Sequence, residues 1–282
     1  MAEFEQQTQT LSLRISEALR NRLERIRATE IRNRNPGTDG TFSGIVSTVA
    51  RLARVVVAEV AHHVTQRGNA RQFLLASDAE RFAYLDLLRE AVRVEDLSVV
   101  GYCVMSNHVH LVLIPHRVEA LALALKSTHG RYASYWNACH ALSGHAWQGR
   151  FYSCPLDEGH LWQALRYTEL NPVRAGLAAQ AAAWRWSSAA AHCGLAEPDA
   201  CLDREPWRHR WSEETWRRFL EAGEAESELR ALRRSTHTGR PLGGAEFIRK
   251  IEQETGRRLT PRQGGRPAKG IADKQEAFGF AK

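Results

Sequence analysis

The chain has 282 residues, of which 43% are hydrophobic, and carries a formal net charge of +7 with a sequence pI near 9.4. This length and composition suit one sizeable domain with appendages or two small domains, and they exclude wholesale disorder. The basic balance favours a polyanionic partner, of which nucleic acid is the usual one, although a basic protein without such a partner has the same composition.

The cysteines and the apolar segments bear on the cellular compartment. The five cysteines are odd in number and include no Cys-x-x-Cys pair, so neither a disulfide framework nor a zinc finger is predicted. The N-terminus lacks a signal pattern, and the apolar runs are too short to span a bilayer. We therefore expect reduced thiols in a cytoplasmic protein.

The first 48 residues differ in pattern from the rest of the chain. They hold a patchy helical stripe among arginines and then a turn-rich stretch from Asn33 to Gly40. They either form a basic arm that touches DNA or are an extension that is poorly ordered or lies upstream of the usual start. We favour the extension.

The core begins near Arg51, where β-branched residues between Val55 and Thr65 predict a first strand. A capping box at Ser77 and Glu80 predicts the start of a helix. The remaining elements are expected as helix, strand, strand, helix, strand and helix at about residues 77–92, 98–105, 108–114, 121–132, 151–154 and 158–170. The order β-α-β-β-α-β is the split βαβ, ferredoxin-like pattern. We predict an α+β fold with an antiparallel sheet, helices on one face and an additional helix that carries the site.

The C-terminal part, residues 196–282, is polar, basic and expected to be partly helical, with some helix around residues 213–232. From Thr236 to Lys269 it holds eight arginines and lysines against three glutamates, an excess of five positive charges. We interpret this segment as a turn-rich, mobile tail that contacts DNA, although a solvated tail has the same composition.

The pair His108 and His110 lies on the predicted hairpin. Successive side chains of a strand alternate faces, so both imidazoles project from one face. Two neutral imidazoles form half of a site for a divalent cation. Taken alone, two histidines at this spacing occur often by chance.

A second group of polar residues, Tyr167 and Asn171, lies four residues apart on the last predicted helix, and so on one face. They flank a stripe that we expect to be buried, formed by Leu161, Ala164, Leu165 and Thr168. A tyrosine oxygen can attack a phosphodiester and form a covalent phosphotyrosine, and a metal ion can polarise the phosphate. Asn171 offers an oxygen that would complete a His-His-Asn metal site.

Five motifs in a fixed order carry a resemblance to a known family: His63–Asn69, Met105–Leu111, Trp147–Phe151, Tyr167–Gly176 and Trp184–Ser188. Over residues 49–195 the chain resembles the single-tyrosine transposases of the HUH nuclease superfamily, and most closely the branch of REP-associated tyrosine transposases. The resemblance implies a ferredoxin-like catalytic domain in which His108 and His110 bind Mg²⁺ or Mn²⁺, Tyr167 is the nucleophile and Asn171 is a third ligand. It also implies a single-stranded or hairpin DNA partner and a location at the bacterial nucleoid.

Several other residues are candidates for a functional role, and each also has a structural interpretation. Arg67, Arg150 and Arg174 lie beside the motifs and are candidate phosphate contacts. Tyr132 and Tyr135 are rival nucleophiles that we expect in the core or a groove, and Trp147, Trp184 and Trp186 are candidate base-stacking or core residues. Among the histidines, His62 or His63 either approaches the site or is an ordinary strand residue. His160, on the same predicted helix as Tyr167, is a candidate for activating the phenol, but no feature of the sequence supports that role.

The predicted function is therefore metal-dependent cleavage and rejoining of single-stranded DNA through a 5′-phosphotyrosine. The alternatives are a domesticated hairpin-binding protein without turnover, a replication initiator or relaxase with the same chemistry, and a metal hydrolase that uses only the histidine pair. The oligomeric state, monomer or homodimer, stays open.

Overall fold

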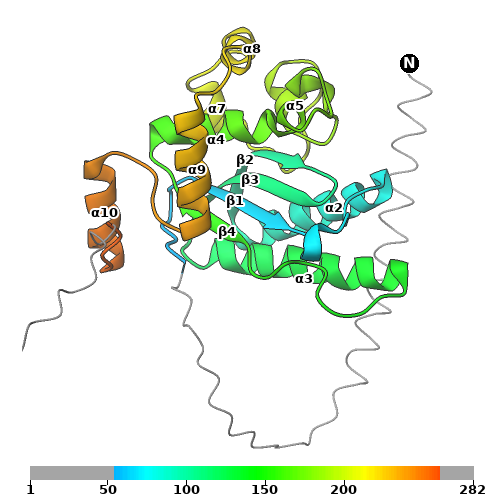
Figure 1. The fold of residues 1–282 in the computed structure, drawn as a ribbon. Helices are drawn as coiled ribbons and strands as arrows, with labels where there is room; N and C mark the ends of the chain where they lie inside the picture. The colour runs from blue at the N-terminus through cyan, green and yellow to red at the C-terminus, as the bar shows by residue number, and fades with distance from the viewer. Residues whose placement is uncertain (1–53, 261–282) are drawn as a thin grey trace, which may run out of the picture.

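The computed structural model describes residues 54–260, in which four antiparallel strands form one sheet (Figure 1). The strands are β1 (His62–Arg67), β2 (Leu97–Val104), β3 (His108–Pro115) and β4 (Tyr152–Pro155). Their order in the sheet is β2-β3-β1-β4. With helices connecting β1 to β2 and β3 to β4, this is the ferredoxin-like arrangement, and the predicted α+β fold is confirmed.

The helices are α2 (Asp78–Glu95), α3 (Ala120–His140), α4 (Glu158–Glu169), α5 (Asn171–Arg174), α6 (Ala189–His192), α7 (Glu205–Arg208), α8 (Glu213–Glu221), α9 (Glu226–Thr238) and α10 (Ala245–Thr255). There are also two 3₁₀ turns in the described residues: η1 (Asn69–Arg71) lies between β1 and α2, and η2 (Ala181–Ala183) lies between α5 and α6. The predicted capping box begins α2, because the Ser77 hydroxyl accepts from the Glu80 amide and the Glu80 carboxylate accepts from the Ser77 amide at 2.7 Å.

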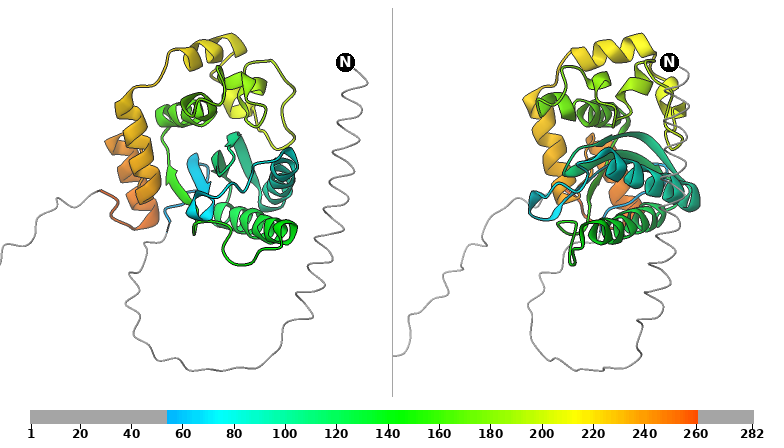
Figure 2. Two further views of the ribbon diagram at one scale, coloured as in Figure 1. Left: turned by 45° about the vertical axis from the view of Figure 1, so that its right-hand side comes forward. Right: turned by 90° about the vertical axis from the view of Figure 1, so that its right-hand side faces the viewer.

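The strand alternation of β3 separates two cores on opposite faces of the sheet. Val109, Leu111 and Leu113 pack with α2 and α3, whereas Val112 packs with α4. Figure 2 shows the sheet between these two groups of helices. His108 and His110 lie on the same side of the strand as Val112, so both face α4.

A glycine lets α4 approach β2 closely. A Cβ atom built on Gly101 would lie 2.1 Å from Cδ1 of Leu165 and 3.0 Å from Oγ of Ser188. A larger residue at this position would therefore require a shift of the Leu165 side chain or of the helix that carries it.

Two expectations for the ends of the core are wrong. Val55 to Val57 form no strand; Val55 and Val57 instead bury their side chains against Ile251 of α10. The segment after Thr236 is not turn-rich throughout, because the apolar residues around Ile251 give α10 a face to bury. The predicted extension, residues 1–48, lies outside the described residues. Within residues 54–260, no helix is long and apolar enough to cross a membrane.

Candidate active site

The two histidines of β3 lie side by side on the face that α4 covers. The ring centroids of His108 and His110 are 5.1 Å apart and their planes are nearly perpendicular, at 85°. Burial lowers the pKa of His108 to about 4, and the positive charges of Arg67 and Arg174 act in the same direction. Burial, followed by the neighbouring His108, holds the pKa of His110 well below its usual value. Both imidazoles are therefore neutral near pH 7, which is the form that binds metal ions.

Tyr167 of α4 lies directly over these histidines. Its ring meets that of His110 edge to face, with centroids 5.4 Å apart, and only 8% of the residue is exposed. The guanidinium of Arg174 lies 4.0 Å from the centre of the tyrosine ring. From α9, Nε of Arg233 donates to the Tyr167 hydroxyl at 3.4 Å. One guanidinium group therefore lies over the ring and a second contacts the hydroxyl oxygen.

The position of Tyr167 results from how α4 is built. Asp157 caps the helix by accepting from the His160 amide at 2.9 Å. The predicted stripe is buried in full, as Leu161, Ala164, Leu165 and Thr168 are each at most 7% exposed. The tyrosine flanks this stripe as predicted and reaches the sheet at its polar positions.

The C-terminal end of α4 is held by a buried carboxylate. Glu169 has no exposed surface and accepts from the Ser188 hydroxyl at 2.6 Å and from Nε1 of Trp216 at 2.8 Å. Nδ1 of His192 lies 2.6 Å from the same carboxylate. Because Glu169 lies between Tyr167 and Asn171 in sequence, this network fixes the helix end that carries the site.

Asn171 begins α5, separated from the last residue of α4, Glu169, by Leu170 alone, and its side chain still turns to the histidines. Nδ2 of Asn171 is 3.5 Å from Nε2 of His108. An amide carries its oxygen and nitrogen on one carbon, and which of them faces His108 depends on the hydrogen-bond network. The structure thus brings together the predicted residues His108, His110, Tyr167 and Asn171.

The ring nitrogen atoms that would bind a divalent metal ion are Nε2 of His108 and Nε2 of His110. Nδ1 of His108 lies 2.6 Å from Oδ1 of Asn107, so its N–H donates there and Nε2 keeps its lone pair. No hydrogen bond to Nε2 of His110 occurs among the described residues. No group of three or more His, Cys, Asp or Glu side chains in residues 54–260 has metal-binding geometry, and the further polar side chain beside the histidine pair is the amide of Asn171.

His63 of β1 belongs to the site as well, one of the two outcomes that the sequence left open. Its ring stacks on His110, and its Nε2 lies 3.0 Å from Nδ1 of His110. Its Nδ1 lies 2.7 Å from Oγ1 of Thr236. Two sets of tautomers satisfy this chain, and in the set that leaves Nε2 of His110 unprotonated, Nδ1–H of His110 donates to His63 and Nδ1–H of His63 donates to Thr236. The Nε2 lone pair of His110 is then directed away from His63.

The candidate phosphate contacts divide between two places. Arg67 pairs with His108 across β1 and β3, and Arg174 stacks on Tyr167 while pairing with Glu224. Arg150 lines a separate pocket with Arg54 at β4. Whether any of them contacts DNA stays a prediction.

The remaining candidates have structural roles. Tyr132 is fully buried and donates to the Leu74 carbonyl oxygen at 2.6 Å, and Tyr135 packs against the same core. His160 is hydrogen-bonded to the capping carboxylate of Asp157. The three candidate tryptophans belong to the core under α2 and α3 or pack against it: Trp147, Trp184 and Trp186.

Sequence reasoning missed Arg233, Thr236 and the role of Asn107. Periodicity cannot fix the position of a helix that begins 57 residues after α4 ends, so Arg233 and Thr236 could not have been assigned. Asn107 lies inside the motif Met105–Leu111, and its place next to His108 was a usable signal.

The fold and the site together define the class: an α+β protein of ferredoxin-like topology with two histidines and a helix-borne tyrosine on one face of the sheet. Residues 56–171 match the family model described as "Transposase IS200 like". This match spans β1 to the start of α5, and it confirms the resemblance predicted from the motifs.

Among solved structures, a REP-associated tyrosine transposase bound to a REP hairpin is similar. It is 16% identical, covers 54% of this chain and 90% of its own, and has a TM-score of 0.45. A structure described as a transposase from Deinococcus radiodurans R1 is 21% identical, covers 41% of this chain and 93% of its own, and has a TM-score of 0.30. No curated protein matches the chain significantly.

Proposed function

We propose that this protein cleaves and rejoins single-stranded DNA through a 5′-phosphotyrosine at Tyr167, with Mg²⁺ or Mn²⁺ held by His108, His110 and Asn171. The observation that carries the proposal is the contact between the Tyr167 ring and His110, 5.4 Å between centroids, beside the Asn171 side chain at His108. The motif resemblance extends the proposal to hairpin-forming repeats as substrates.

The chemistry is a reversible transesterification. The Tyr167 oxygen attacks the scissile phosphorus, a phenolic O–P bond forms, the P–O3′ bond breaks and the 3′ oxygen leaves with a proton as a hydroxyl. A bound divalent metal would supply polarisation of the phosphate oxygens. The guanidinium groups of Arg174 and Arg233 stabilise negative charge at the phenol oxygen. Attack of a 3′-hydroxyl on the phosphotyrosine reverses these bond changes and rejoins the strand.

The proposal is tested by incubating the protein with single-stranded oligonucleotides that contain hairpin-forming repeats from the flanking genomic DNA, with Mg²⁺ or Mn²⁺. A protein–DNA band that survives denaturation and disappears when the metal is chelated is the expected result. Hairpin binding without cleavage or adduct under any metal would instead favour a domesticated DNA-binding protein.

The metal assignment has its own test. His108→Ala and His110→Ala should each abolish cleavage, because each removes one of two imidazole ligands. Binding of the same hairpin should be largely retained, since affinity for DNA comes mainly from basic side chains. Cleavage at the wild-type rate in the double variant would contradict the site.

A further inference from the structure

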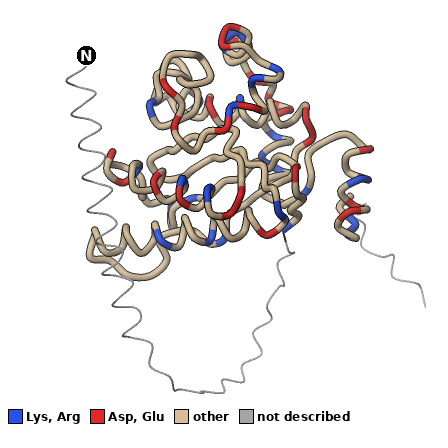
Figure 3. Tube along the Cα trace, turned by 180° about the vertical axis from the view of Figure 1, so that it is seen from behind, with Lys and Arg blue, Asp and Glu red and all other residues tan. Residues whose placement is uncertain are grey.

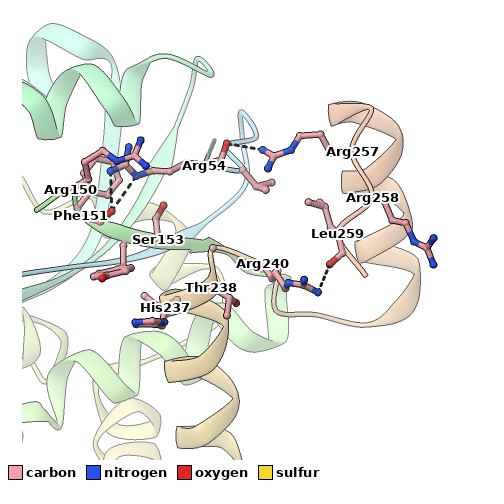
Figure 4. Close-up of a pocket in the computed structure, with 14 residues that line it drawn as sticks. Arg54, Arg150, Phe151, Ser153, His237, Thr238, Arg240, Arg257, Arg258 and Leu259 are labelled. Carbon is pink, nitrogen blue, oxygen red and sulfur yellow. Dashed lines mark hydrogen bonds between the residues drawn. The ribbon is translucent and has the colours of Figure 1, made fainter. Parts of the chain in front are cut away.

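Five arginines gather around one pocket outside the cluster of His108, His110 and Tyr167. The pocket has a volume of about 610 Å³ and lies between the edge strand β4, the end of α9 and the segment after α10 (Figure 4). The arginines are Arg54, Arg150, Arg240, Arg257 and Arg258. Within residues 54–260, no aspartate or glutamate lines the pocket.

The positive charge of this arginine pocket is only partly balanced within residues 54–260, where the Glu252 carboxylate interacts with Arg258. Arg54 donates to the Phe151 carbonyl oxygen and stacks on its ring, Arg257 donates to the Arg54 carbonyl oxygen, and Arg240 donates to that of Leu259. None of the five forms an ion pair within residues 54–260. Along the rest of the described trace, by contrast, acidic and basic residues are interspersed (Figure 3).

The arginines also repel one another. The pKa of Arg54 is lowered, first by burial and then by the positive charge of Arg150. Holding like charges together costs free energy, and an anion in the pocket removes that cost. Guanidinium groups bind phosphate oxygens through paired N–H donors, so phosphate is the favoured ligand.

The pocket wall carries an exposed aromatic pair. Tyr152 and His237 stack with ring centroids 4.9 Å apart and planes 15° from parallel, and both are exposed. Such a platform binds an unpaired nucleobase, whose ring face is free, whereas bases in a duplex stack on each other. Phosphate and base sites together indicate single-stranded nucleic acid.

The pocket is also connected to the catalytic cluster. Thr236 lines the pocket, and its hydroxyl oxygen lies 2.7 Å from Nδ1 of His63, which in turn contacts His110. A strand bound in the pocket is therefore separated from the histidines by one side chain of α9 and one of β1.

We propose that the arginine pocket binds the phosphate backbone of the unpaired DNA strand that leads to Tyr167, with one base stacked on Tyr152. The proposal rests on the proposed function for its substrate, single-stranded DNA. It adds a binding site formed by β4, α9 and the segment after α10, separate from the residues that cleave.

The test is equilibrium binding of a fluorescent single-stranded oligonucleotide to the full chain, measured by anisotropy over a salt series with the metal chelated. The double variant Arg150→Gln/Arg258→Gln removes two exposed guanidinium groups for which the structure shows no hydrogen bond. The matched control Arg93→Gln/Arg249→Gln removes the same charge from α2 and from α10 outside the pocket, again at exposed positions.

Two lost phosphate contacts should reduce the slope of log K against log salt by about 1.4, at about 0.7 for each contact to a single strand. The control pair should leave the slope nearly unchanged. Tyr152→Ala should weaken binding about tenfold, and Tyr152→Phe, which keeps the ring, should restore it.

Equal slopes for the pocket variant, the control and the wild type would overturn the proposal. So would an equal loss of affinity for a duplex of the same sequence. Cleavage is measured separately with Tyr167→Phe: if that variant still cleaves, the proposed mechanism fails while the binding result stands. If the wild type binds no single strand, both fall.

Discussion

The two histidines among the candidate metal ligands are oriented by different neighbours. His108 is held by Asn107, its predecessor in the chain, at 2.6 Å, whereas His110 is held by His63 on the adjacent strand at 3.0 Å. Side chains that hydrogen-bond the far nitrogen of a ligating histidine fix its tautomer and ring orientation. His63 is therefore a positioning residue, and Thr236 at 2.7 Å supports it in turn.

We predict that His63→Ala lowers metal affinity about 10- to 100-fold, because Nδ1 of His110 loses its partner. Isothermal titration of the DNA-free protein with Mn²⁺ measures this without relying on activity. His160→Ala is the control on the same face of the molecule and should bind Mn²⁺ as the wild type does. Equal Mn²⁺ affinity in the His63 variant and the wild type would show that His63 only packs.

At the scale of the element, α4 is the part that carries the site, and it is fixed at three levels. Asp157 caps its start, Leu165 lies over Gly101, and Glu169 anchors its end to α6 and α8. The contact of Leu165 with Gly101 and the contacts of Glu169 with α6 and α8 join segments that are distant in sequence. The orientation of Tyr167 therefore depends on the C-terminal helices as well as on the sheet.

We predict that Glu169→Ala lowers the free energy of unfolding by about 3–5 kcal/mol, because it leaves the donors of His192 and Trp216 buried without an acceptor. Glu214→Ala in α8, which breaks an exposed pair with Arg218, should cost less than about 1 kcal/mol. Urea denaturation compares the two variants. A loss at Glu169 no larger than that at Glu214 would rule out an anchoring role.

Much of this architecture was predictable from local pattern. Period-two alternation placed His108 and His110 on one face, and helical spacing placed Tyr167 beside the stripe that ends at Thr168. Local pattern fails where the partner is distant: Val55 to Val57 have strand composition but pack on α10, and Arg233 reaches Tyr167 from a helix whose docking no periodicity specifies. Long-range packing decides both cases.

At the scale of the whole molecule, the fold buries an unusual set of neutral histidines. Burial lowers the pKa of His62 and His108 to about 4 and that of His63 and His129 to about 3, and holds that of His110 well below its usual value. Three of these five lie in the candidate site. Because these buried imidazoles resist protonation in the folded protein, the histidines of the site contribute to the pH dependence of the free energy of unfolding.

We predict that the metal-free protein loses stability as the pH falls from 6.5 to 5. In that range the unfolded chain binds protons that the folded histidines, with their lowered pKa values, do not bind, so the free energy of unfolding decreases with falling pH. Each histidine contributes up to about 1.4 kcal/mol per pH unit. Urea denaturation across this range measures the slope, and His129→Gln should reduce it by one histidine's share. A flat profile would contradict the lowered pKa values.

The central claim is that Tyr167 forms the covalent bond to DNA, and mapping the trapped adduct tests it most directly. The protein is incubated with a cleavable single-stranded substrate and metal, denatured and digested, and the DNA-linked peptide is identified by mass spectrometry. The account predicts DNA on the peptide that contains Tyr167, and neither adduct nor cleavage in Tyr167→Phe, which keeps the ring packed against His110 and Arg174. DNA on Tyr132 or Tyr135, or full cleavage by Tyr167→Phe, would contradict it.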